Sequence, residues 1–372
     1  MKRLLLIGGG HSHLEVVRRF GVRPVADAEI TLIDATQFAT YSGMLPGLIA
    51  GHYKFHDCHV DLAALAQRAN VRFLQARVFG IDTIRHRLEF EEGRALEYDL
   101  ISIDVGSTPP TAGIAGVVDY ALAVKPFAAF ARNWEKLIGR AERGEVRSIV
   151  AVGGGAASIE ILLSMQYRLA RSASSKSLGF ALVSEAGCVL PGMNPGTRAA
   201  MERLLIERNI SLHLNTRVES VAHDALILSG SVRIPADATL WATGAGAPLW
   251  LGATGLALDA QGFIAINEHL ASVSNAGVFA AGDCATLQGY CYPKSGVYAV
   301  RQGPILAENL RGALTGGQLT HYRPQQTALM LISTGDQYAV ATYGRYTQEG
   351  AWVWRWKNYI DRKFMRKYRC DS

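Results

Sequence analysis

One glycine-rich turn occurs twice in this chain, each time between an apolar run and a segment with helical periodicity. The first copy reads LLLIGGGHSHLEV over residues 4–16, and the second reads IVAVGGGAASIEI over residues 149–161. A strand that enters a helix through Gly-x-Gly-x-x-Gly turns tightly, lets a pyrophosphate approach without an intervening side chain, and places that anion at the helix N-terminus. The duplication therefore predicts two dinucleotide-binding units in one chain.

The first turn supplies Gly8 and Gly10, and the helix after it begins with His11 and Ser12. We expect these four residues to bind the first dinucleotide. His13 stands where the motif has its third glycine. A larger residue there predicts a slightly wider crossing between helix and strand.

The second turn supplies Gly153 and Gly155, with Ser158 in place of its third glycine, and we expect these residues to bind the second dinucleotide. An acid at the end of the next strand should bind ribose hydroxyls, and Asp34 and Glu185 hold those places. A carboxylate at residue 185 would repel a 2′-phosphate, so NADH is predicted as the donor, with NADPH as the alternative. For either copy alone, a glycine turn in some other α/β enzyme is the competing interpretation.

Composition narrows the setting in which the chain works. It has 372 residues, 49% of them hydrophobic, which is enough for more than one core. Its five cysteines form no Cys-x-x-Cys pair, which favours a reducing cytoplasmic setting. Glycines interrupt the first apolar run and no run reaches about 18 apolar residues, so we expect no export signal and no transmembrane helix. Membrane contact, if it occurs, should be peripheral, at the inner face of the cytoplasmic membrane.

At GVFAAGDCA, residues 277–285, the chain resembles the two-dinucleotide-binding flavoproteins of the pyridine nucleotide-disulfide oxidoreductase superfamily. The resemblance rests on the order of the first glycine turn, the Ala-Thr-Gly that ends at Gly244, and the pair Gly282 and Asp283. It implies that FAD binds the first unit, with Asp283 at its ribitol end, and that a nicotinamide nucleotide binds the second.

The resemblance and the repeated plan of the chain together predict an α/β fold of the glutathione-reductase type. ISIDVGSTPP and TLWATGAGAP are counterparts that close the two meanders after the glycine turns. We expect tandem Rossmann-like FAD and NAD(P)H domains and a small C-terminal α+β module. The expected boundaries are 1–115 and 246–319 for a discontinuous FAD domain, 116–245 for the NAD(P)H domain, and 320–372 for the C-terminal module.

A narrower resemblance is to type II NADH dehydrogenases and sulfide:quinone oxidoreductases, in TYSGMLPGLIAGHY and YPKSGVYAVRQGPILAENL. GGGHSH, YSGMLPGLIAGHY and WKNYIDRKFM together most closely resemble the dehydrogenase-like domain fused in front of selenide, water dikinases. A helix beginning near Ser295 and Gly296, with Val297 in its first turn, would direct its free N–H groups at the flavin. Lys294, which would add a positive charge, and Pro46, packed along the isoalloxazine, are the candidate catalytic residues. A solvated lysine and an ordinary turn proline are the competing interpretations.

The cysteine positions exclude a dithiol relay. Disulfide reductases carry a redox-active cysteine pair about thirty to forty residues after the first glycine turn. Here that interval reads FATYSGMLPGLIAGHY and contains no cysteine. Sulfide:quinone oxidoreductases need a sulfur-handling cysteine from the middle of the chain, and none lies between Cys58 and Cys188. Cys284 and Cys291 flank the Gly-Asp turn, where packing is the favoured explanation over reactivity.

No metal site is expected. His52, His56, Cys58 and His59 lie close together in GHYKFHDCHVD, but the cluster lacks a second matched ligand pair.

The C-terminal tail, residues 351–369, is basic and aromatic. As a helix it would gather Trp352, Trp356, Tyr359, Ile360 and Phe364 on one side. Indoles flanked by Arg and Lys suit a bilayer interface, which makes peripheral membrane contact one hypothesis. Docking on the same protein or on the second copy of a homodimer is the equal alternative, and nucleic-acid binding is not expected.

These features favour an FAD-dependent NADH oxidoreductase that passes electrons to a quinone-type acceptor. In such an enzyme the protein mainly stacks and orients the reacting rings. One alternative is a soluble reductase for a sulfur- or selenium-containing acceptor. Another is a redox sensor or assembly partner that binds FAD without turnover.

Overall fold

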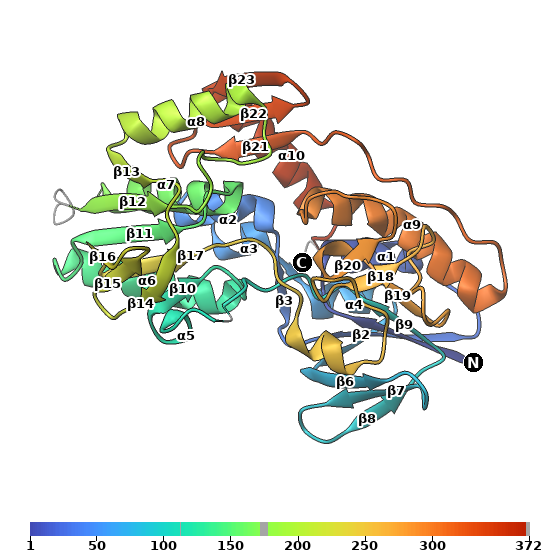
Figure 1. The fold of residues 1–372 in the computed structure, drawn as a ribbon. Helices are drawn as coiled ribbons and strands as arrows, with labels where there is room; N and C mark the ends of the chain where they lie inside the picture. Colours follow the sequence, from blue (N-terminus) through green and yellow to red (C-terminus); the bar gives the residue numbers. More distant parts are fainter. Residues whose placement is uncertain (112, 172–177, 370–372) are drawn as a thin grey trace.

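The computed structural model describes residues 1–111, 113–171 and 178–369, and it contains two parallel sheets side by side (Figure 1). A smaller antiparallel sheet at the C-terminal end lies above the second of them. Each large sheet is built around one of the two glycine turns, which follow β1 in the first sheet and β11 in the second.

The first sheet is parallel, with five strands in the order β19, β9, β1, β2, β5. Its central strand is an apolar run, buried from Leu4 to Ile7, that pairs with β2 on one side and β9 on the other. Burial of successive residues is typical of a parallel sheet with both faces covered. The strands are β1 (Lys2–Ile7), β2 (Ala28–Asp34), β5 (Arg72–Gln75), β9 (Leu100–Ile103) and β19 (Val278–Ala280).

Two distant parts of the chain complete this first unit. β19 pairs with β9, with Val278 opposite Ile101, so residues near 280 finish a sheet that begins at residue 2. The helix that the sequence predicts after Lys294 is 20 residues long and continues through Pro304. The helices of this unit are α1 (His11–Val22), α4 (Leu62–Arg68) and α9 (Gly296–Thr315).

The second sheet repeats the first, with five parallel strands in the order β10, β17, β11, β12, β13. Its strands are β10 (Ala121–Ala123), β11 (Ser148–Val152), β12 (Gly179–Val183), β13 (Ile210–His213) and β17 (Ala238–Trp241). Its helices are α5 (Val117–Tyr120), α6 (Phe127–Glu142), α7 (Ala156–Leu169) and α8 (Pro195–Glu207).

Each unit also carries the three-stranded antiparallel meander that the sequence predicts. In the first unit it is β6 (Val78–Asp82), β7 (Arg87–Phe90) and β8 (Ala95–Glu97). In the second it is β14 (Val218–Val221), β15 (Ala225–Leu228) and β16 (Val232–Pro235). Short elements fill the remainder: β3 (Phe38–Thr40), η1 (Ser42–Met44), α2 (Leu45–Ile49), α3 (Phe55–Cys58), β4 (His59–Asp61), η3 (Leu249–Ala253), β18 (Ile264–Ile266), η4 (Gly282–Cys284) and β20 (Ala285–Leu287).

The C-terminal module is an antiparallel sheet followed by one helix. It consists of β21 (Met330–Ser333), β22 (Ala339–Tyr343), β23 (Tyr346–Gly350) and α10 (Ala351–Arg366). The helix has an unusual distribution of side chains, because Lys357 and Asp361 are buried while Trp352 and Trp356 are exposed. Of the aromatic residues that were expected to gather on one side, Trp352, Trp356 and Tyr359 are exposed, whereas Phe364 is buried and stacks on Tyr41, with ring centroids 4.3 Å apart.

The predicted α/β class with two Rossmann-like units is therefore confirmed. The expected boundaries near residues 115, 246 and 320 fall between named elements and stay a prediction. Among the described residues, no helix is both long and apolar enough to cross a lipid bilayer.

Glycine substitutions can test the close packing of α1 against α9. A Cβ at Gly303 in α9 would lie 2.8 Å from the Glu15 Cβ in α1. Gly303→Val should therefore lower the free energy of unfolding by about 1–3 kcal/mol through overpacking. The matched change Gly139→Val in α6, where a Cβ meets nothing nearer than the Arg143 guanidinium at 3.4 Å, should change it by less than about 0.5 kcal/mol. Urea denaturation of the two variants measures both values, and equal losses would contradict the packing.

Candidate cofactor-binding sites

The first glycine turn is closed by a carboxyl group from a different strand. Gly8 has a φ of 92°, and a Cβ there would overlap the backbone of Asp104, which follows β9. A Cβ on Gly10 or on Gly282 would overlap the Asp104 side chain. Two segments about 270 residues apart in the sequence, the turn and η4, thus need glycine because both contact the same carboxyl group.

Asp104 also occupies the N-terminus of α1. Its Oδ2 accepts the backbone N–H groups of Ser12 at 2.8 Å and of His13 at 3.1 Å. Burial raises the pKa of this carboxyl to about 7, against the lowering effect of those hydrogen bonds. A protonated Asp104 adds no negative charge beside a bound pyrophosphate, so the group is compatible with an anionic ligand at neutral or lower pH.

His13 explains why the first turn tolerates a large third residue. The imidazole is buried, with Nδ1 2.7 Å from the Gly8 carbonyl and Nε2 2.8 Å from Ser102 Oγ. Burial lowers its pKa to about 4, so it is neutral and one nitrogen accepts while the other donates. The side chain ties the glycine turn to β9.

Asp34 lies at the end of β2, as the sequence predicts, and contacts the turn directly. Its Oδ2 accepts the Gly9 N–H at 2.7 Å, and its Oδ1 accepts the N–H and hydroxyl of Thr36 at 2.8 and 2.9 Å. The carboxylate is held beside the glycine turn, where a ribose would lie if a dinucleotide follows the Rossmann pattern.

Asp283, in η4, forms a hydrogen-bonded group with Ser107 and Lys125. Asp283 Oδ2 accepts from Lys125 Nζ at 3.2 Å and from Ser107 Oγ at 3.2 Å, and Lys125 also donates to Ser107 at 2.8 Å. Burial lowers the pKa of His11 to about 4, with Asp283 opposing and Lys125 assisting. Lys125 comes from the second unit, and the sequence analysis did not identify it.

The predicted flavin-side residues lie around the start of α9 and η1. Gly296 begins α9, and a Cβ there would lie 3.6 Å from Ser42 Oγ and 3.7 Å from His11 Nε2. Val297 follows in the same first turn. Pro46 is buried in α2.

Lys294 is hydrogen-bonded to β20. Its Nζ donates to the Ala285 carbonyl at 2.5 Å and to Thr286 Oγ1 at 2.8 Å, and it lies 4.0 Å from the centre of the Phe263 ring. These contacts anchor the lysine to β20, and its role beside the flavin stays a prediction.

The second turn has the same shape but is open. Gly153 has a φ of 117°, and Gly155 precedes α7 without a side chain capping the helix. A Cβ at Gly155 or at Gly244 would meet no atom within 4 Å. These are the features of a helix N-terminus that is free to receive an anion.

Unpartnered polar atoms mark both turns. Within the described part of the chain, no hydrogen-bond partner is found for the buried atoms Ser158 Oγ and Thr243 Oγ1 at the second turn, or His11 Nε2 at the first. Buried polar atoms are rarely left without a hydrogen-bond partner, so an unpartnered atom usually marks the place of a ligand or a water. The residues present therefore fit FAD at the first turn and a nicotinamide nucleotide at the second.

Glu185 does not match Asp34 in position. β11 pairs with β12 through Val152 and Val183, as β1 pairs with β2 through Ile7 and Ile33, so Ser184 is the counterpart of Asp34. Glu185 lies one residue further along, 71% exposed and 3.7 Å from Arg217. Its contact with ribose stays a prediction, now with a cation beside it.

A cluster of charged side chains joins α7, η1 and α10, with Lys357 and Asp361 buried and Glu160 partly buried. Lys357 donates to the Gly43 carbonyl at 2.5 Å and to Asp361 at 2.7 Å, and Asp361 accepts from the Tyr41 hydroxyl at 3.1 Å. Glu160 accepts the Ser333 N–H at 2.7 Å. Burial raises the pKa of Glu160 to about 7, while the Lys357 charge opposes that rise. Through Tyr41 and Gly43 the cluster contacts the segment just before Pro46, the residue expected along the flavin.

Several residues of these sites were not found from the sequence. Asp104, Lys125, Glu160, Lys357 and Asp361 come from segments that only the tertiary fold brings together. The one available signal was Asp104, an acid at the end of an apolar strand in ISIDVGSTPP.

Residues 2–303 match the family described as pyridine nucleotide-disulphide oxidoreductase. The chain belongs to this family. A probable NADH dehydrogenase from Dictyostelium discoideum is 23% identical over 75% of this chain and 67% of its own length. A type II NADH:quinone oxidoreductase from Staphylococcus saprophyticus is 20% identical over 85% of this chain and 83% of its own length.

Solved structures show the same fold. The sulfide:quinone oxidoreductase of Aquifex aeolicus superimposes with a TM-score of 0.84 at 20% identity, over 99% of this chain and 92% of that one. NDH2 of Plasmodium falciparum in complex with NADH superimposes with a TM-score of 0.80 at 14% identity, over 99% and 98% of the two chains.

Despite the family's name, the described cysteines form no disulfide bond. The four within the described ranges are free, and Cys58 and Cys284 are buried. Burial raises the pKa of both thiols to about 12, so neither is a thiolate at neutral pH. His52 and His59 beside Cys58 bond to the carbonyls of Gly335 and Phe55, each at 2.7 Å.

The carboxyl of Asp104 predicts a specific pH dependence of stability. Its pKa is about 7 in the folded protein and near 3.8 in the unfolded chain, so stability falls as pH rises from 4 to 7 and then levels off. Asp104→Asn cannot titrate, so its free energy of unfolding relative to wild type should rise by about 2–3 kcal/mol between pH 5 and pH 8.

Chemical denaturation at both pH values, with FAD in excess, measures this difference. Asp119→Asn, at an exposed residue in α5, is the matched control and should show no such change. A difference between Asp104→Asn and wild type that is independent of pH would contradict the assignment.

Proposed function

We propose that this protein is an FAD-dependent NADH oxidoreductase that delivers electrons to a quinone. The observation that carries the proposal is the pair of glycine turns, each at the end of a parallel sheet and each with an unpartnered buried polar atom. The family and the NADH dehydrogenase and type II NADH:quinone oxidoreductase relatives support it. Bound FAD supplies a ring that takes a hydride from NADH and passes electrons on.

The residues of the chain bind and orient rather than react. We expect Asp34, Asp283 and the N-terminus of α9 to hold FAD along the first unit, and the open N-terminus of α7 to hold the pyrophosphate of NADH. Correct orientation of two reacting rings accounts for much of the acceleration of a direct hydride transfer. Cys58 and Cys284 are inert thiols, which favours a route that uses no sulfur.

Reduction of a quinone also requires protons, and the cluster of charged side chains can hold one. Glu160 has a pKa of about 7, so it is protonated in a large fraction of molecules at neutral pH. It lies in α7, near Lys357, whose ammonium contacts the Gly43 carbonyl next to the expected flavin position. We assign Glu160 to holding a proton for the acceptor and Lys357 to positioning the segment around Gly43.

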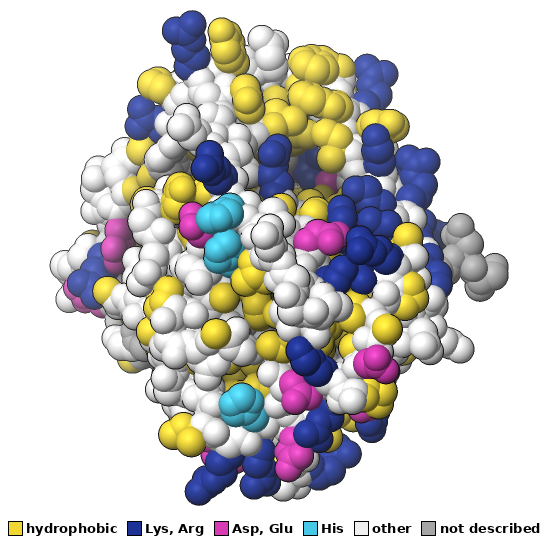
Figure 2. Space-filling model, turned by 90° about the vertical axis from the view of Figure 1, so that its right-hand side faces the viewer, with side chains coloured by type: hydrophobic (Ala, Val, Ile, Leu, Met, Phe, Trp, Pro, Cys, Tyr) yellow, Lys and Arg dark blue, Asp and Glu magenta, His cyan; other side chains and the backbone are white. Residues whose placement is uncertain are grey.

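The outer face of α10 favours an acceptor that dissolves in a membrane. Trp352, Trp356 and Tyr359 are 48%, 40% and 57% exposed. Figure 2 shows hydrophobic side chains gathered near the top of the molecule, with Lys and Arg side chains around them. Because the inner face of α10 already packs on the protein, the exposed aromatic face is available for a bilayer interface, at the inner side of the cytoplasmic membrane.

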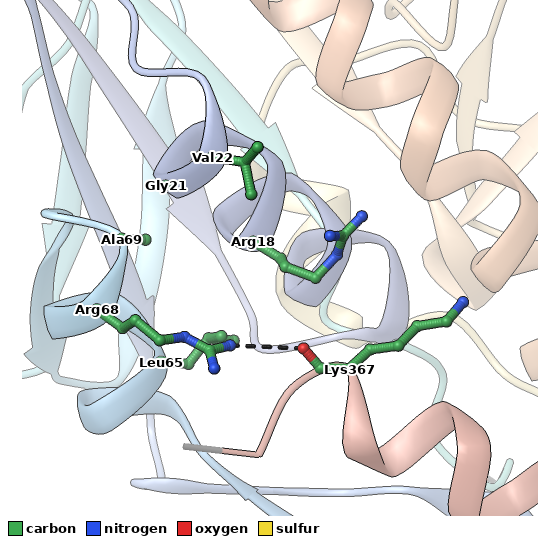
Figure 3. A pocket seen from close by; sticks show the side chains of 7 residues that line it. All are labelled: Arg18, Gly21, Val22, Leu65, Arg68, Ala69 and Lys367. Carbon is green, nitrogen blue, oxygen red and sulfur yellow. Dashed lines mark hydrogen bonds between the residues drawn. The ribbon is translucent and has the colours of Figure 1, made fainter. Parts of the chain in front are cut away.

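Further positive charge surrounds the end of α10. Arg18, Arg68 and Lys367 line a cavity of about 310 Å³ between α1, α4 and the end of this helix (Figure 3). Arg362, Arg366 and Arg369 line a second cavity, together with Asp57 and Met365. Anionic lipid headgroups would be attracted to such a surface at low ionic strength and released by salt.

Two alternatives rest on particular observations. The likeness of GGGHSH and WKNYIDRKFM to the dehydrogenase-like domain fused to selenide, water dikinases favours a selenium- or sulfur-containing acceptor. The absence of a capping group at α7 permits a sensor that binds nucleotide without turnover.

An anaerobic titration separates these functions. NADH, in preference to NADPH, should bleach the visible absorbance of bound FAD, and a short-chain quinone should restore it. Glu160→Gln should keep the bleaching step and slow the quinone-driven recovery on the order of a hundredfold, because the acceptor loses its proton source. Glu142→Gln, at an exposed residue of α6, is the control.

Each outcome decides between candidates. Bleaching without recovery on addition of quinone would reject the quinone and favour the sulfur or selenium acceptor. No bleaching by NADH or NADPH would favour the sensor.

Membrane contact has its own test. The double variant Trp352→Ser/Trp356→Ser should bind vesicles of phosphatidylglycerol and phosphatidylcholine at least about tenfold more weakly than wild type, because two interfacial indoles are lost. Co-sedimentation measures the binding. Ile84→Ser/Val232→Ser, which removes two exposed apolar side chains elsewhere, should bind normally. If wild type does not bind vesicles but forms a dimer, and the tryptophan variant does not dimerise, this face would instead be assigned to a homodimer interface.

A further inference from the structure

A second group of polar side chains lies on the first unit, away from both glycine turns. Glu268 and His269 lie in the turn after β18, and His321 lies in the segment after α9. One ligand atom of each residue lies within 4.8 Å of the other two. The two imidazole centres are 4.4 Å apart, and Figure 2 shows two histidine side chains in contact beside an acidic one.

A buried amide fixes the backbone beneath this group. Asn309 is fully buried in α9, and its Nδ2 donates to the carbonyls of His269 at 2.7 Å and Thr320 at 2.9 Å. Its Oδ1 accepts the Thr320 N–H at 2.6 Å, and the Tyr322 N–H donates to the Glu268 carbonyl at 2.7 Å. The two segments are therefore held side by side before any ligand binds.

The hydrogen bonds of the group also select the imidazole form that binds metals. His269 Nδ1 lies 3.3 Å from the Thr320 carbonyl, where only a protonated nitrogen is favourable, so Nε2 keeps its lone pair. Metal-binding histidines typically donate their other N–H to such a carbonyl. His321 Nδ1 lies 2.9 Å from Glu268 Oε1, which brings the carboxylate next to the second imidazole.

We propose that Glu268, His269 and His321 form a site for a divalent transition-metal ion, with Zn²⁺ as the best match. Two imidazoles and one carboxylate are a donor set that Zn²⁺ accepts, with water in the fourth position, whereas Mg²⁺ and Ca²⁺ prefer oxygen ligands. Tetrahedral coordination at about 2.1 Å needs ligand atoms about 3.5 Å apart. Small side-chain rotations reach this spacing, because Glu268 and His321 are half-exposed, at 51% and 54%.

The position of the site gives it a structural role. His321 belongs to the connector, residues 316–329, that carries the chain from α9 to the C-terminal module. A metal ion shared with Glu268 and His269 would fasten this connector to the first unit. The C-terminal module would then be tethered at both ends, by the metal at the connector and by α10 packed on η1.

Calorimetric titration of the FAD-loaded protein with ZnCl₂ tests the site. Wild type should bind one Zn²⁺, and His269→Ala or His321→Ala should each weaken that binding at least about tenfold, with a smaller loss for Glu268→Gln. His223→Ala, an exposed histidine between β14 and β15, is the matched control and should bind normally. MgCl₂ should produce no comparable binding.

A second measurement follows the connector itself. Zn²⁺ should raise the melting temperature of wild type and slow proteolytic cleavage within residues 316–329, and both effects should vanish in the His269→Ala/His321→Ala variant. FAD content and circular dichroism establish that each variant is folded, and Glu268→Gln, an exposed isosteric change, serves if an alanine variant does not fold. Failure of wild type to bind Zn²⁺, or equal binding by wild type and Glu268→Gln together with the folded histidine variants, would overturn the proposal.

Discussion

The arrangement of the first unit depends on the contacts of the buried Asp104 carboxyl group. This group touches Gly10, caps the first N–H groups of α1, and packs against Gly282 from the far end of the chain. Because a carboxyl in that place leaves no room for a Cβ, the glycines at both points follow from it. Burial keeps the group neutral up to about pH 7, so the same residue can close the turn and still lie beside an anion.

The two glycine turns share a backbone shape but differ in the side chains that contact them. Asp104 and His13 tie the first turn to β9, whereas within the described ranges no side chain caps α7 at the second. A turn fastened on several sides suits a cofactor that stays bound, and an open helix N-terminus suits a nucleotide that enters and leaves in each cycle. This difference agrees with the proposed division into FAD and NADH sites.

Short-range patterns in the sequence were sufficient to predict the strands, the glycine turns and the order of the two units. They predicted α9 through Pro304 and the position of Asp34, because those features depend on neighbours in the sequence. They did not reveal Lys125, Glu160 or Lys357, which acquire their partners only when α7, η1 and α10 meet. Helical periodicity grouped Phe364 with the tryptophans, although it packs on Tyr41, because periodicity cannot tell which face of an aromatic helix meets the protein. Glu185 was matched to Asp34 as the acid near the end of the strand that follows the second turn, and strand register shifts that match by one residue.

The distribution of side chains on α10 limits how the proposed membrane contact can be tested. Its concealed side carries Lys357 and Asp361, and its outward side carries indoles. A chain cut before Ala351 would lose the outward side, but it would also take the cation away from Glu160 and the stacking partner away from Tyr41. Truncation would thus disrupt the interior as well as remove the exposed aromatic face. Loss of activity in the truncated protein would therefore not distinguish between these two causes. Only surface replacements on this helix can separate anchoring from catalysis.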